Sequence, residues 1–112
     1  MSLKADKVVT ADGNSNFTWL SLRKEVQNNG SLFVYGNFGG GTVAVNISPD
    51  GGVTFIPMLD QLGNAVSFTS DGMQNFYLNG CSNPIEDQQV VIQFALTGST
   101  SPSLTYRIFD AL

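Results

Sequence analysis

Carboxylates are the side chains of this chain that could support acid–base chemistry. Hydrolysis of a glycosidic bond needs two carboxyl groups held at a fixed separation across the scissile bond. Nearly all acidic residues of the later chain instead fall in turn-forming sequence, where aspartate accepts hydrogen bonds from nearby backbone N–H groups. These residues are Asp50, Asp60, Asp71, Glu86, Asp87 and Asp110. The pattern favours a turn-capping role for each, and no catalytic residue is predicted.

Composition excludes two other kinds of site. The chain contains no histidine and one cysteine, Cys81. A Ser-His-Asp triad and a Cys/His zinc cluster are therefore both impossible. Cys81 has no histidine to activate it, so we interpret it as a small, semi-buried residue. No carboxylates have EF-hand spacing, although Asp71 with Glu86 and Asp87 could weakly hold a surface Ca²⁺. We predict no enzyme activity, no cofactor and no resident metal ion.

Charge is scarce and unevenly distributed. Charged residues make up 12% of the 112-residue chain, and the net charge is −4. Four of the five basic residues lie near the N-terminus: Lys4, Lys7, Arg23 and Lys24. Binding to a phosphate backbone needs a basic stripe, so no nucleic-acid partner is expected. No apolar run reaches the ~18 residues of a membrane span, so no membrane partner is expected either.

Aromatic side chains offer the other kind of binding site. A sugar-binding β-sandwich stacks tryptophan or tyrosine rings on the faces of pyranose rings, and the candidates here are Trp19, Tyr35, Tyr77 and Tyr106. Each of them lies inside a strand-like run, where burial in the core or at an interface is the default expectation. Glycan binding therefore stays an alternative to a purely structural role.

Short alternating runs separated by turn clusters dominate the whole chain. Strands are predicted over residues 7–10, 17–22, 31–37, 42–47, 53–59, 65–69, 74–78, 89–96 and 104–111. Such spacing predicts an all-β fold, an antiparallel β-sandwich or jelly roll of about eight strands. The length suits one domain, residues 1–112, and residues 1–6 could form an extended N-terminal arm.

Two short segments predict an interface strand and a chain reversal. The run 17–22 carries Phe17 and Trp19 on one face, with Leu20 and Leu22 on the other. A strand that is apolar on both faces is central or lies at an interface. Asn29-Gly30 is the sequence signature of a type I′ hairpin, so we predict a chain reversal there.

The strongest turn signal lies between the runs 42–47 and 53–59, where we predict a hairpin. Within it the order Ser48, Asp50, Gly52, Thr54, Phe55 resembles an Asp-box, the hairpin motif of sialidases and related repeats. The motif is structural wherever it occurs. We expect Asp50 to accept backbone N–H bonds across the turn and Phe55 to anchor in the core.

Three longer segments carry a wider likeness, residues 35–43, 45–55 and 96–105. They resemble small structural proteins encoded among the virion genes of tailed bacteriophages. The resemblance implies a β-sandwich or jelly-roll subunit that decorates the head or forms part of a tail or fibre, located in the virion and assembled in the host cytoplasm. Scarce charge and two-sided strands suggest a homo-oligomer that also contacts other virion proteins, with an interface in the first third of the chain. The alternative is a carbohydrate-binding β-sandwich module used for adhesion.

Overall fold

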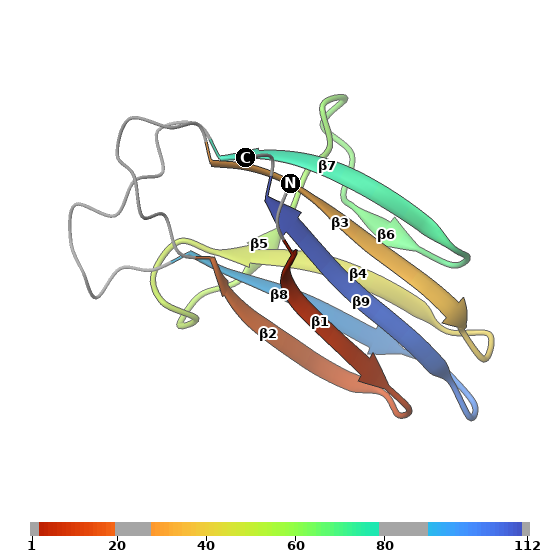
Figure 1. Ribbon diagram of the computed structural model, residues 1–112. Coiled ribbons are helices and arrows are strands. Elements are labelled where there is room, and N and C mark those ends of the chain that lie inside the picture. Colours follow the sequence, from red (N-terminus) through yellow and green to blue (C-terminus); the bar gives the residue numbers. More distant parts are fainter. Residues whose placement is uncertain (1–2, 20–27, 79–89, 111–112) are drawn as a thin grey trace.

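The computed structural model describes residues 3–19, 28–78 and 90–110, which form two packed β-sheets (Figure 1). The fold is all-β, as predicted from the spacing of turn clusters. The described strands are β1 (Leu3–Val9), β2 (Gly13–Trp19), β3 (Asn28–Asn37), β4 (Thr42–Ser48), β5 (Ile56–Pro57), β6 (Ser67–Phe68), β7 (Gly72–Leu78), β8 (Val90–Thr97) and β9 (Ser103–Asp110). All pairings between them are antiparallel.

The strand order is that of a jelly roll. The first sheet has the order β1-β9-β3-β7, and the second has the order β2-β8-β4-β5, with β6 also paired to β4. If β5 and β6 are counted as one interrupted strand, the pairs are nested: β1 pairs with β9, β2 with β8, β3 with β7, and β4 with β5 and β6. That nested pairing wraps the chain into the two sheets of a jelly roll. Successive strands therefore cross repeatedly from one sheet to the other.

The core lies between the sheets and is formed by the alternate residues of each strand that point inward, and β8 is buried at Val91 and Gln93 of its outer side as well. Tyr106 of β9 stacks on Phe94 of β8 across the two sheets, with ring centroids 4.5 Å apart and planes at 11°. Trp19 meets Phe76 edge-on at 5.1 Å. The side chains around these rings are almost inaccessible: Leu32, Val34, Val43, Val45, Ile92, Leu96, Leu104 and Ile108. Burial of this apolar surface is the main force holding the two sheets together.

Three local predictions differ from the structure. Residues 3–6 are not a separate arm, because they begin β1 and pair with β9. Asn29-Gly30 does not form a hairpin, because both residues lie inside β3. A Cβ on Gly30 would lie 2.5 Å from Phe76 Cζ, so glycine is required there by close packing rather than by a turn. Of the predicted strand 53–59, only Ile56–Pro57 is a strand, which pairs with β4, and Pro57 lies at the sheet edge as expected.

Several sequence expectations lie outside the described residues. They include the outer apolar residues of the run 17–22, Cys81, and the acidic pair Glu86 and Asp87. Within the described part of the run 17–22, which ends β2, Phe17 and Trp19 both point toward the core, as the alternation predicted. Among the described residues there is no helix long and apolar enough to cross a membrane.

Candidate functional site

The Asp-box-like turn is held by its own side chains. Ser48 donates its hydroxyl hydrogen to Asp50 Oδ1 at 2.7 Å, and its Oγ accepts the N–H of Gly52 at 2.9 Å. Asp50 Oδ1 also accepts the N–H of Thr54 at 2.8 Å, which is the backbone bond expected for this residue. The Thr54 N–H and the Ser48 hydroxyl hold the pKa of the Asp50 carboxyl below its ordinary value. The carboxylate is committed to the turn itself.

Phe55 does not anchor between the sheets, contrary to the expectation from the motif. It is only half-buried and stays outside the central cluster. A Cβ on Gly52, which has φ +97°, would lie 3.9 Å from Phe55 Cζ and 3.8 Å from Val91 Cγ2. Val91 lies between the core residues Val90 and Ile92 of β8, so its side chain points to the outer face of the second sheet. A side chain on an outer face is usually exposed, but that of Val91 is only 6% exposed. The turn thus folds back over this outer face and covers Val91.

The carboxylates of Asp12 and Asp60 also accept hydrogen bonds from backbone groups. Asp12 accepts the N–H and the hydroxyl of Ser99, which joins the β1–β2 and β8–β9 connections. These bonds hold the pKa of Asp12 below its ordinary value. Asp60 Oδ1 accepts the N–H groups of Leu62 and Asn64, both at 2.9 Å. No group of three or more potential metal ligands occurs among the residues that the structure describes.

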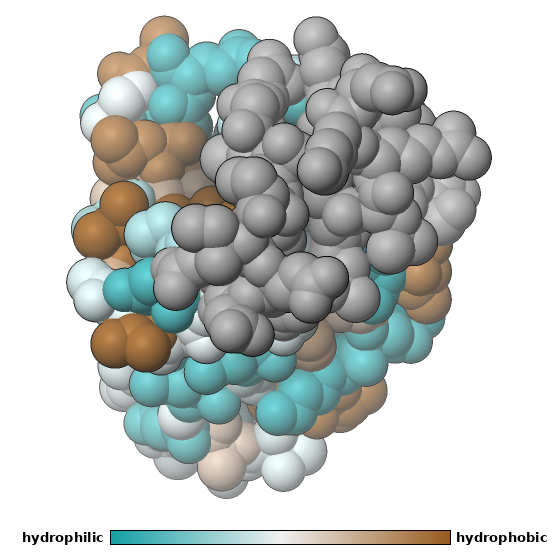
Figure 2. Space-filling view, turned by 90° about the vertical axis from the view of Figure 1, so that its left-hand side faces the viewer, coloured by the Kyte–Doolittle hydropathy of each residue, from teal (hydrophilic) through white to brown (hydrophobic). Residues whose placement is uncertain are grey.

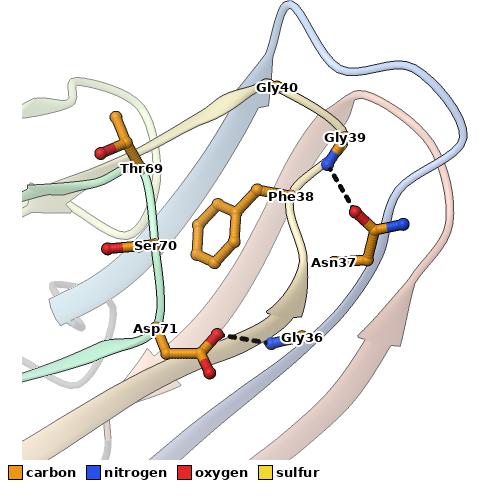
Figure 3. Close-up of a pocket in the computed structure, with 8 residues that line it drawn as sticks. All are labelled: Gly36, Asn37, Phe38, Gly39, Gly40, Thr69, Ser70 and Asp71. Carbon is orange, nitrogen blue, oxygen red and sulfur yellow. Dashed lines mark hydrogen bonds between the residues drawn. The ribbon is translucent and has the colours of Figure 1, made fainter.

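A pocket of about 490 Å³ opens beside the β3–β4 connection (Figure 3). Asp71 Oδ1 accepts the Gly36 N–H at 2.9 Å, and Asn37 Oδ1 accepts the Gly39 N–H at 3.0 Å. The Phe38 ring lies between these loops, whereas the hydroxyls of Thr69 and Ser70 point away from it. A sugar site needs polar groups that converge beside the ring. Here they hold the loops, so this pocket does not supply the geometry of a glycan site.

The outer face of the first sheet is rich in aromatic and apolar side chains. Along each strand these residues alternate with residues that are buried in the core, so their side chains point away from the core. We call this surface the aromatic face and define it by Leu3, Val8, Phe33, Tyr35, Met73, Tyr77 and Phe109. The rings of Phe33 and Phe109 meet edge-on at 5.5 Å.

A single cross-strand row runs through the centre of the aromatic face. In register, Asp6 of β1 pairs with Arg107 of β9, which pairs with Phe33 of β3, which pairs with Met73 of β7. The only charges in this row form an ion pair with each other, Arg107 Nε to Asp6 Oδ1 at 3.3 Å. Met73 is 48% exposed and Tyr77 is 50% exposed. The row is therefore electrically balanced, with an ion pair at the β1–β9 end and two apolar side chains at the β3–β7 end.

The outer face of the second sheet has different chemistry. Its central cross-strand row runs from Asn16 of β2 through Gln93 of β8 to Asn46 of β4, and Asn46 Nδ2 donates to Gln93 Oε1 at 2.9 Å. The next row places Ala95 opposite Ala44. We call this surface the amide face. It has small and polar side chains, except at Val91, which the turn covers.

The sequence candidates for glycan stacking divide into two pairs. Trp19 and Tyr106 are buried in the core, as the default expectation required. Tyr35 and Tyr77 both lie on the aromatic face, where they are 37% and 50% exposed. Figure 2 shows apolar residues reaching the surface on both flanks of the molecule. The second exposed apolar group comprises Val53, Ile56, Leu59 and Leu62, between β4 and β6.

Sequence reasoning missed the aromatic face, although a signal for it was present. The run Leu32-Phe33-Val34-Tyr35 is apolar on both faces of β3, which is the pattern of a strand buried on both sides. The two-sided pattern was instead assigned to the run 17–22. Comparisons of the chain with family models, with curated proteins and with solved structures find no match.

Proposed function

We propose that this chain is a non-enzymatic structural protein of a bacteriophage virion, a head decoration or fibre-type subunit that assembles as a homo-oligomer through its aromatic face. The observation that carries the proposal is the uncovered apolar surface of the first sheet. Exposed apolar surface of this kind on soluble proteins often marks an association surface, and here the polar pairs Ser31–Asn75 and Asp6–Arg107 lie among the apolar side chains. The jelly-roll strand order is compatible with the role, since this architecture recurs in capsid and lectin domains, although a fold by itself does not specify a function.

Two edge strands give the proposal independent support. β2 and β7 lie at sheet edges, and neither contains a charged residue. An uncharged edge of seven residues is poorly protected against pairing with another chain. By contrast, the β1 edge carries Lys4, Asp6 and Lys7. Such unprotected edges suit a chain that normally packs against copies of itself or against a shell.

The first test is the size of the protein in solution. Size-exclusion chromatography with light scattering at micromolar concentration should give a mass that is a multiple of the 12.0 kDa chain. A stable monomer over the whole range would contradict homo-oligomerisation. For the virion role, antibody labelling of purified phage particles that encode the chain should decorate them regularly, and particles without label would contradict it.

Carbohydrate binding is the second candidate function, and the observation in its favour is the exposure of Tyr35 and Tyr77 on a sandwich face. Glycan-array binding that Tyr77→Ala abolishes would support this reading. Oligomerisation that Tyr77→Ala weakens, with no glycan bound by either protein, would support the structural role instead.

A further inference from the structure

A short hairpin between β5 and β6 presents an apolar tip. Figure 1 shows this segment projecting beyond the two sheets near β7. Leu59 is 59% exposed and Leu62 is 86% exposed. Tips of surface hairpins usually carry polar residues or glycine, because exposure of an apolar side chain to water is unfavourable in free energy. An apolar side chain at such a point is a candidate for a contact with another molecule.

The hairpin is fixed at both its base and its tip. At its base, the Met58 N–H donates to Val45 O at 3.0 Å and the Val66 N–H donates to Met58 O at 2.8 Å, and both side chains are buried in the core. At its tip, Asp60 Oδ1 accepts the Leu62 N–H, and the Asp60 N–H donates to Asn64 O at 2.8 Å. Little conformational entropy would therefore be lost when Leu62 is bound.

A hollow of about 290 Å³ lies beside this tip, at the margin of the aromatic face. It is lined by Gln61 of the hairpin and by Met73, Gln74, Asn75 and Tyr77 of β7, so it contains no charged side chain. A cavity of about 150 Å³ is sufficient to hold benzene, so this hollow has room for a leucine side chain. Met73 and Tyr77 are its exposed apolar walls and would contact such an occupant, whereas its other three lining residues carry amides.

We infer that Leu62 of one copy packs into this hollow of a second copy, and that the second copy returns the same contact. A two-fold interface requires both complementary features on one surface patch of each chain, and here the apolar tip and the hollow are neighbours. The hollow is also continuous with the aromatic face through Met73 and Tyr77. The inference rests on the proposed homo-oligomer and specifies its symmetry and its central contact.

The test compares the dimer dissociation constant of the wild type with those of two variants. Leu62→Asp places a charge in the hollow and should weaken dimerisation by about tenfold or more. Val53→Asp is the matched control, because Val53 is 83% exposed but lies in the Asp-box-like turn. It should change dimerisation by no more than about twofold. Far-ultraviolet circular dichroism checks that both variants fold.

Cross-linking gives a second readout. In a Cys81→Ser background, Leu62→Cys combined with Met73→Cys should form an intermolecular disulfide under mild oxidation, whereas Val53→Cys with Met73→Cys should not. An oligomer that survives Leu62→Asp unchanged and gives no cross-link would overturn this inference while leaving the proposed function standing. A mass of three chains, or of any other odd number, would overturn the two-fold symmetry. A wild-type protein that is monomeric at every concentration would overturn the proposed homo-oligomer as well.

Discussion

The two outer faces of this sandwich are both formed by antiparallel strands, but they differ in whether their apolar side chains are covered by the chain itself. On the amide face the apolar residue Val91 is covered by the chain itself, through the turn that Asp50 holds. On the aromatic face Tyr35, Met73 and Tyr77 stay partly exposed. Among the described residues, therefore, the chain covers an apolar outer residue at Val91 on the amide face and leaves those of the aromatic face partly exposed. This difference between the faces is the reason for the proposal that another molecule covers the aromatic face.

The largest effect should come from placing an unpaired charge on the aromatic face. Met73→Glu puts a carboxylate in the central row of this face beside Phe33, with no cation opposite it, so association would bury the charge unpaired. We expect self-association to weaken by about 100-fold or more, measured by sedimentation equilibrium. Asn16→Glu places the same charge on the amide face and should leave association unchanged. Equal effects of the two variants would remove the distinction between the faces.

The next effect concerns the covered face. Asp50→Ala removes the acceptor for the Thr54 N–H and the Ser48 hydroxyl, so the turn over Val91 should loosen. We expect the melting temperature to fall by about 4–8 °C, with no loss of any ligand binding. Asp50→Asn keeps a side-chain carbonyl in the same place and should recover much of the loss. Unchanged stability together with lost binding would show that Asp50 serves a ligand rather than the turn.

The stability of the folded protein should fall at alkaline pH because of Tyr106, which lies in the core between the two sheets. Burial, followed by the negative charge of Asp12, raises the pKa of Tyr106 to about 12. Because the folded protein holds this proton more tightly than the unfolded chain, stability should be intact below pH 10 and should fall as pH rises toward 12. Tyr106→Phe should remove part of this alkaline loss, seen in thermal melts between pH 8 and 12, without affecting association. An identical alkaline profile would show that Tyr106 is not the titrating group.

The smallest effect is expected at acid pH, in the two capped turns. Hydrogen bonds lower the pKa of Asp50 and of Asp12 in the folded state. A lowered folded pKa contributes stability that is present above the unfolded pKa and is lost as pH falls through the folded pKa. Melting temperatures should therefore decline below about pH 4, and Asp12→Asn should flatten the decline slightly. A decline as steep in Asp12→Asn as in the wild type would assign the acid sensitivity elsewhere.

The sequence was sufficient for the fold class and for most strands, because alternation and turn residues act locally. It was also sufficient for the backbone bond to Asp50, since that bond closes within one turn. It was not sufficient for Gly30, whose glycine is required by the Phe76 ring from another strand. Nor could it place Phe55, because the turn folds over a face that only sheet pairing creates. The aromatic face needs the register of four strands before its side chains form one surface.

The central claim is that the aromatic face is buried by self-association while the amide face is not. Hydroxyl-radical footprinting at rising protein concentration measures this directly, because it reports the solvent access of individual side chains. Labelling of Tyr35, Met73 and Tyr77 should fall as concentration rises. Labelling of Val53, in the turn that covers the amide face, and of Pro57, which pairs with Asn46 of that face, should stay constant. Constant labelling of the three aromatic-face residues, or protection confined to Val53 and Pro57, would contradict the account.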